Sequence, residues 1–277
     1  MKKLLLLSSA IVAASPALAA DLPMKAPVAA VPYTWSGCHI GANIGAVWDR
    51  TTYSDPGTFA PGFLGLLPPG VTQNFVPAGT AFSSNSKGGI LGGVQGGCDY
   101  QFASHWVIGF GGDYSWTSLN HVANDPFFAG KNGGPPLLTS QTDQIATLTG
   151  RIGYAWNRVL FYGKGGAAYA HDNYIAQNFT FLNNNFCNNA AGQGCIATGS
   201  AQRWGWTAGA GVEYAFYENW SAFVEYDHYG FANKTIQMNI LNGVTVPANL
   251  TAKHDIDTVK FGVNYRIWSP GPVVARY

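Results

Sequence analysis

The sequence lacks charge, and it lacks any apolar run after its first twenty residues that could cross a membrane as a helix. Charged residues make up 10% of the chain, well below the ~25% of an ordinary soluble protein. No later segment approaches the ~18 consecutive apolar residues of a spanning helix. So few charges would solvate a soluble domain poorly, and any contact with lipid must come from strands.

An excess of positive charge is also absent. Of the 15 Lys and Arg residues, Lys2 and Lys3 belong to the leading segment, which leaves 13 against 14 acidic residues. Binding of nucleic acid requires a basic stripe or patch, and this balance argues against it. The sequence therefore predicts no nucleic-acid partner.

The chain begins with the charge, hydrophobe and small-residue order of a secretory signal peptide. Lys2 and Lys3 precede an apolar stretch over 4–12, and small residues follow to Ala19 and Ala20. That stretch is about half the ~20 residues of a membrane anchor. We expect a signal peptide over 1–20, cleaved after Ala19 or Ala20, and a Pro- and Ala-rich periplasmic leader over 21–34.

From Trp35 onward the chain alternates with a period of two residues. In the last such segment Val259, Phe261 and Val263 share one face, while Lys260 and Gly262 share the other. One face of each strand thus prefers lipid. Eight such segments occur, at 36–50, 87–102, 106–119, 141–156, 158–170, 203–216, 220–231 and 254–268. Each meets the ~9–11 residues of a tilted crossing, and an even count suits a closed barrel.

The connections between these segments alternate in length. Short turns lie at 103–105, Asn157 and 217–219, and long connections rich in Gly, Pro, Asn, Ser and Thr cover 51–86, 120–140, 171–202 and 232–253. Short periplasmic turns and long external loops are typical of outer-membrane barrels. We therefore expect an all-β, eight-stranded antiparallel transmembrane β-barrel over 35–268 with four long extracellular loops, followed by a tail over 269–277.

A soluble sandwich or lipocalin-like barrel would also alternate, but it would place its apolar face inward. Here the face opposite the bulky residues carries glycines together with charged residues, which suits a narrow polar interior. These candidate lumen charges are Asp113, Arg151, Lys164, Glu213, Glu225, Lys260 and Arg266. Asp113 and Arg151 lie on adjacent strands, as do Glu213 and Glu225. A plug of ion pairs is the favoured interpretation, and a conducting pathway is the alternative.

Aromatic residues gather at the ends of the predicted strands. They are Trp35, Trp48, Tyr100, Phe102, Trp106, Trp116, Tyr154, Trp156, Phe216, Trp220, Tyr265 and Trp268. Such positions are typical of the two interfacial girdles of a membrane barrel.

Several segments, in order, carry a family resemblance. They are Ala20-Asp21-Leu22-Pro23, Tyr33-Thr34-Trp35-Ser36-Gly37, the glycine-rich strand 88–97, the strand 106–115 and the closing strand 259–268. The set resembles the small outer-membrane β-barrel proteins of alphaproteobacteria, known as porin-family or outer-membrane immunogenic proteins and distantly similar to OmpA-type barrels. The resemblance implies an eight-stranded barrel and surface exposure, and for some relatives haem binding or host recognition.

The final strand also resembles the signal read by the barrel-assembly machinery, with Lys260, Gly262, Tyr265 and Ile267 in the expected order. Family barrels usually stop at the terminal aromatic residue. This chain departs from that pattern, because a nine-residue tail from Ser269 to Tyr277 follows Trp268.

Six histidines raise the hypothesis of a metal or haem site. They are His39, His105, His121, His171, His228 and His254, and they are scattered without the spacing of a metal site. His121, His171 and His254 fall in or beside the external loops and are the better candidates. We nevertheless expect neither a metal nor a cofactor.

Four cysteines in an exported protein suggest disulfides. Cys38 and Cys98 lie near the periplasmic ends of the first two strands with matching parity, and Cys187 and Cys195 lie eight residues apart in one loop. We expect the bonds Cys38–Cys98 and Cys187–Cys195.

These features favour a structural and surface-antigen role in the outer membrane, with no enzymatic activity. Expected partners are outer-membrane lipid or lipopolysaccharide, the assembly machinery, and a host molecule or small ligand at the external loops. A small-solute pore and a haem-binding surface are the alternatives. A barrel enzyme acting on lipid A or peptides would need a His/Ser or His/Asp group at a rim, and no convincing set is found.

Overall fold

The structure, a computed structural model, describes residues 33–54, 81–83, 88–124, 137–179, 195–240 and 248–268. The predicted signal peptide, the leader up to Pro32 and the tail after Trp268 lie outside this range. Within it, no helix is long and apolar enough to cross a membrane.

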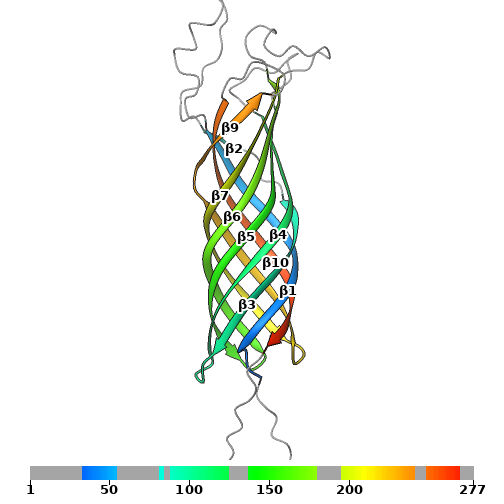
Figure 1. Ribbon diagram of the computed structural model, residues 1–277, viewed down its shortest axis with the longest axis vertical. Helices are drawn as coiled ribbons and strands as arrows, with labels where there is room; N and C mark the ends of the chain where they lie inside the picture. The colour runs from blue at the N-terminus through cyan, green and yellow to red at the C-terminus, as the bar shows by residue number, and fades with distance from the viewer. Residues whose placement is uncertain are drawn as a thin grey trace, which may run out of the picture. The chain divides into compact units, whose positions relative to one another are not determined.

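Eight antiparallel strands close into a ring, as Figure 1 shows. They are β1 (Gly37–Ser54), β3 (Gly88–Gln101), β4 (Trp106–Asn124), β5 (Leu137–Trp156), β6 (Val159–Phe179), β7 (Cys195–Ala215), β8 (Trp220–Phe231) and β10 (Ala248–Trp268). Each pairs with its neighbour in the chain, and β1 closes the ring on β10. The predicted fold class is confirmed.

The strands extend beyond the predicted segments at the end of the barrel that carries the long connections. β4 continues to Asn124, β5 begins at Leu137, and β6 and β7 reach Phe179 and Cys195. Two short strands, β2 (Ala81–Ser83) and β9 (Lys234–Ile240), also pair in predicted loops. The loop boundaries were wrong because these extensions carry polar residues on both faces, so the apolar alternation ends before the strands do.

The opposite end has the three short turns that the sequence predicts. His105 and Asn157 occupy two of them with φ of 68° and 54°, a left-handed conformation that asparagine and histidine tolerate better than most residues. The main-chain N–H of Ala155 donates to the carbonyl oxygen of His105 at 2.8 Å. The turn at His105 is therefore bonded to the end of the neighbouring strand β5, which fixes this rim.

The outer wall is apolar, as the alternation predicts. Ile44, Phe110, Leu148 and Trp204 are each 65–69% exposed on it. Bulky aromatic residues form two girdles on this wall. The lower girdle, near the short turns, includes Trp106, Tyr154, Trp220 and Tyr265. The upper girdle, near the long connections, includes Trp48, Trp116 and Trp204. On β10 the lower girdle lies at Tyr265 and the upper girdle at Asp257, the register partner of Trp48. The stretch of β10 between these two levels matches the ~9–11 residues of a tilted crossing.

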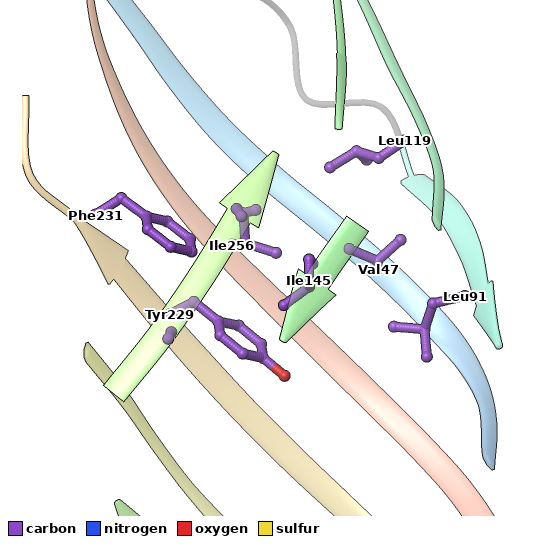
Figure 2. Close-up of a cluster of buried hydrophobic side chains, with 9 residues drawn as sticks. Val47, Leu91, Leu119, Ile145, Tyr229, Phe231 and Ile256 are labelled. Atoms are coloured by element: carbon purple, nitrogen blue, oxygen red, sulfur yellow. The ribbon is translucent and has the colours of Figure 1, made fainter. Parts of the chain in front are cut away.

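The interior is layered rather than uniformly polar, which corrects the expectation of a polar lumen. At the level of the upper girdle, inward side chains from strands around the ring meet in an apolar layer, seen in Figure 2. This upper apolar layer consists of Val47, Leu91, Leu119, Ile145, Ala168, Ala170, Tyr229, Phe231 and Ile256. The period-two alternation places these residues on the inward face, but on each strand they alternate along that face with glycines and charged residues. The apolar layer is therefore not visible in any single strand.

Candidate functional site

The lumen is closed at its short-turn end by a second apolar layer. This lower apolar layer consists of Trp35, Val107, Ala155, Leu160, Tyr162 and Ala215, with Tyr33 packed against it. The Trp35 indole N–H donates to the carbonyl oxygen of Asn157 at 3.3 Å. The ring of Tyr33 lies under the guanidinium of Arg266, 4.5 Å from its centroid. The chain entering β1 thus caps the barrel base.

Charged side chains fill the space between the two apolar layers. Arg151 is the centre of one group, because its Nε donates to Asp99 Oδ1 at 2.6 Å and its Nη1 to Glu213 Oε2 at 3.2 Å. Glu213 also accepts from Ser221 at 2.5 Å and from the Asn264 amide at 2.8 Å. The buried carboxylate is therefore fully bonded, as a buried charge requires.

Two lysines organise the other group. Lys164 Nζ lies 2.6 Å from Glu225 and 3.1 Å from Asp227, and Lys260 Nζ lies 3.0 Å from both Asp113 and Asp227. Lys260 is 2% exposed, and Asp227 is fully buried. Each ammonium is thus shared between carboxylates on other strands, and the group ties opposite walls of the barrel together.

Lumen glycines let side chains on the two flanking strands meet. Gly109 lies between Asp99 and Arg151 in the register, and a Cβ there would overlap the Asp99 carboxylate. The same arrangement recurs where Gly209 separates Lys164 from Asp227, Gly211 separates Tyr162 from Glu225, and Gly41 separates Gln95 from Asn264. The glycine content of the lumen face therefore serves the polar network.

Six of the seven predicted lumen charges belong to this network, and Arg266 does not. Arg266 lies at the base, where its Nη1 donates to the Thr34 carbonyl oxygen at 2.6 Å. Although Asp113 and Arg151 are on adjacent strands, they do not pair with each other: Asp113 pairs with Lys260 and Arg151 with Asp99. The prediction missed Asp99 and Asp227. Their inward parity, shared with Gly97 and with Glu225, was the signal that could have found them.

A small cavity remains inside the charged layer. Its volume is about 60 Å³, and its lining includes Asn43, Gln95, Thr149 and Asn264 together with the lumen charges. This volume is enough for water, and the polar side chains around it can bind it.

One group of acidic residues within the described range has the spacing of metal ligands. Asp113, Glu225 and Asp227 place one carboxylate oxygen each within 4.8 Å of the others. The ammonium groups of Lys164 and Lys260 already lie among these oxygens at 2.6–3.1 Å. The two lysines therefore supply the positive charge that a cation would bring.

A second polar cluster lies beyond the upper apolar layer, on the side of the long connections. His121 and His254, two of the predicted ligand candidates, both approach Asp49 there. The Thr51 hydroxyl lies 3.2 Å from His254 Nδ1, and the Tyr174 hydroxyl lies 3.4 Å from Nε2. Burial of the neutral ring lowers the pKa of His254 to about 4.

Arg203 and Asp172 form a buried ion pair in the same cluster. Arg203 also donates to the Tyr174 hydroxyl and, at 2.9 Å, to the carbonyl oxygen of Ala252. Burial raises the pKa of the Tyr174 hydroxyl, so this group stays a neutral donor to Asp172 at 3.2 Å. The cluster is bonded within itself and is closed to solvent.

The other histidines are separate from this cluster. His171 and His228 lie on the outer wall, where each places Nδ1 beside an aspartate, at 2.9 Å from Asp143 and 2.8 Å from Asp257. His39 lies 3.4 Å from Asp99 at the lower end of the lumen. His105 lies in a turn. The three ligand candidates are therefore not brought together, since His171 faces outward.

The disulfide between Cys38 and Cys98 is present, with its Cα atoms 4.0 Å apart. The two residues face each other in the register of β1 and β3, as their parity predicts. Cys187 lies outside the described residues, so the bond Cys187–Cys195 stays a prediction.

Comparison with known proteins agrees with this architecture. The family model for the outer membrane protein beta-barrel domain matches residues 4–266. The chain is 29% identical over 273 residues to the 31 kDa outer-membrane immunogenic protein of Brucella melitensis, covering 96% of this chain and all of that one. It is 26% identical over 275 residues to the 25 kDa outer-membrane immunogenic protein of Brucella canis, covering 96% and 98%.

Solved outer-membrane protein structures align with this chain at low identity. The outer membrane protease OmpT of Escherichia coli aligns with a TM-score of 0.50 and 8% identity, over 86% of this chain and 99% of that one. OprG of Pseudomonas aeruginosa aligns with a TM-score of 0.46 and 14% identity, over 84% and 98%. The strand ring, its apolar wall and the match over most of the sequence place this chain in the outer-membrane β-barrel protein family, as an integral protein of the outer membrane.

Proposed function

We propose that this chain is a sealed structural barrel that supports the outer membrane and holds its long connections at the cell surface. The observation that carries the proposal is the closed lumen. Two apolar layers, one on Leu160 and Trp35 and the other on Ile145 and Ile256, enclose the layer of ion pairs between them. An eight-stranded barrel is just wide enough for side chains to fill, and here they do.

This filling disfavours a small-solute pore. A diffusing ion would have to pass both apolar layers, and in each of them side chains such as Leu160 and Ile145 are at most 1% exposed. It would also have to displace the shared ammonium groups of Lys164 and Lys260. Buried charges that lose their partners cost several kcal/mol, so a resting pathway through the centre is unfavourable.

An enzymatic role is also disfavoured. The His/Asp cluster on the side of the long connections has the residue types of a hydrolytic site, but His121, His254 and Asp49 are each 1% exposed. A lipid or peptide substrate cannot reach side chains buried to that extent. The likeness to OmpT concerns the fold alone, and the Brucella relatives carry the name of immunogenic proteins.

A surface-antigen role follows from topology together with those relatives. In outer-membrane barrels the short turns face the periplasm and the long loops face outward. The long connections of this chain leave the barrel at one end, opposite the turns at His105 and Asn157. We propose that a host molecule or small ligand meets the protein at these connections, and that the barrel-assembly machinery engages β10 during insertion.

Planar-bilayer recording of the refolded protein tests the sealed lumen. We expect no stepwise current from the folded barrel, as from a heat-denatured sample, while a general porin in the same bilayer gives discrete steps. A gel shift between unheated and heated samples confirms folding beforehand. Stepwise currents from the folded protein would overturn the proposal and make the lumen charges a conduction pathway.

A further inference from the structure

The lysine group in the lumen carries more negative than positive charge. Asp113, Glu225 and Asp227 share the two ammonium groups of Lys164 and Lys260 at 2.6–3.1 Å. The lysines fill the space between the three carboxylates, but they balance only two of the three negative charges. A net charge between two apolar layers is unfavourable, so a further positive charge is required nearby.

A chain of side-chain amides leads to a buried oxygen that accepts no hydrogen bond. The Glu213 carboxylate can only accept, so the amide nitrogen of Asn264 faces it, at 2.8 Å. The Asn264 oxygen then accepts from Gln95 Nε2 at 2.8 Å, and Gln95 Oε1 accepts from Asn43 Nδ2 at 2.7 Å. The carboxylate thereby fixes the orientation of all three amides. Asn43 Oδ1, at the end of the chain, has no hydrogen-bonding partner among the described residues.

Two further buried oxygens lie close to Asn43 in the register. Gly93 on β3 separates Asn43 on β1 from Ser115 on β4, and a Cβ at Gly93 would lie 2.5 Å from Ser115 Oγ. Asp113 precedes Ser115 by two residues, so it shares the lumen face of β4. Within the described part of the chain, neither Ser115 Oγ nor Asp113 Oδ2 has a hydrogen-bonding partner.

A cation meets the needs of these oxygens and of the charge together. Asn43 and Asp113 line the cavity in the charged layer, and both are at least nine-tenths buried. A water molecule could donate to the oxygens, but it would leave the excess negative charge in place. A hard cation binds to oxygen and supplies that charge. The Lys260 ammonium, 3.0 Å from Asp113 Oδ1, repels a second positive charge and so favours a monovalent ion.

We propose that the lumen holds one monovalent alkali cation, bound by Asn43 Oδ1 and Asp113 Oδ2. Ser115 Oγ and water complete its oxygen ligands. The ion balances the lysine group and ties β1 to β4 across the glycine of β3. This cation site is independent of the seal of the barrel, which bilayer currents test separately.

Urea unfolding in phosphatidylcholine vesicles tests the site, with sodium chloride compared with choline chloride at equal ionic strength. Choline is too large for the cavity of about 60 Å³, so only sodium can bind the folded state. We expect the equilibrium constant for folding to be about tenfold higher in sodium chloride, the effect of a ligand at about ten times its Kd. Equal constants in the two salts would overturn the site.

Two variants remove the two features that define the site. Asn43→Leu removes a ligand oxygen, and Asp113→Asn removes the excess negative charge with little change in shape. Both should lose the difference between the salts. The matched control is Thr149→Val, because Thr149 lines the same cavity while its hydroxyl donates to the Gly111 carbonyl oxygen at 3.4 Å. This control should keep the difference.

A difference between the salts that all three variants share would be a bulk effect of salt and would overturn the site. A proton held by the lysine group is the other source of positive charge. In that case stability would fall as the pH rises, equally in both salts, and this result would also overturn the cation. The heat-induced gel shift confirms that each variant is folded before its titration.

Discussion

Arg151 on β5 bonds to Asp99 on β3 across the intervening strand β4, with its Nε 2.6 Å from Asp99 Oδ1. The register position between them is Gly109. Without a side chain at that position the two charged groups meet directly over the β4 backbone. The pair thereby links β3 and β5 directly, although β4 lies between them.

Gly109→Ala tests this arrangement. The added Cβ would overlap the Asp99 carboxylate and separate it from Arg151, so the free energy of unfolding should fall by about 3–5 kcal/mol, the cost of breaking a buried pair. Gly150→Ala is the control, because its Cβ would meet nothing nearer than 3.9 Å, and its effect should stay within about 0.5 kcal/mol. Urea unfolding in lipid vesicles measures both; equal effects would contradict the role of Gly109.

Lys260 should contribute strongly to the free energy of unfolding, because its ammonium is shared between two buried carboxylates. Lys260→Met leaves Asp113 and Asp227 without the ammonium they share at 3.0 Å, so the free energy of unfolding should fall by about 3–5 kcal/mol. In Lys260→Met the ammonium of Lys164, 3.1 Å from Asp227 and 3.7 Å from Asp113, is left to balance both carboxylates and Glu225. Adding Asp227→Asn removes one of these negative charges and should restore part of the loss. Urea titration of the two variants checks this order, and a double variant less stable than the single one would contradict it.

The sequence predicted the wall of the barrel better than its interior. Lipid imposes one simple pattern, so Val259, Phe261 and Val263 reveal their face by alternation alone. Inside the barrel, the partner of Arg151 depends on which residue of the neighbouring strand lies opposite it and whether that residue is a glycine. This register is known only once the strands are paired. The upper apolar layer was missed for a similar reason, since Ile145 and Ile256 have inward parity but come together only when the ring closes.

The cluster around His254 predicts loss of stability in acid. The ring is 1% exposed, and the charged or titratable groups that act on it are Asp172, Arg203, Asp49 and His121, with Tyr174 in contact. Because the pKa falls from 6.5 to about 4 on folding, the unfolded chain binds more protons between these values. The contribution of His254 to stability is therefore complete above pH 6.5 and is lost as the pH falls towards 4.

This loss amounts to about 3 kcal/mol in the free energy of unfolding. Urea titrations from pH 7 to pH 4 should show it in the wild type, and His254→Asn should show a shallower decline over the same range. His105→Asn is the control, because His105 lies exposed in a turn and should leave the decline unchanged. Parallel declines in the wild type and His254→Asn would contradict the assignment.

The disulfide Cys38–Cys98 should stabilise the barrel by restricting its unfolded chain. It closes a loop with a sequence separation of 60 residues between the first two strands, so the double variant Cys38→Ser/Cys98→Ser should lose about 2–4 kcal/mol of the free energy of unfolding. A reductant should weaken the wild type by a similar amount and leave the variant unaffected. Peptide mapping without reduction should also find Cys187 joined to Cys195; either cysteine bonded to Cys38 or Cys98 would contradict both pairings.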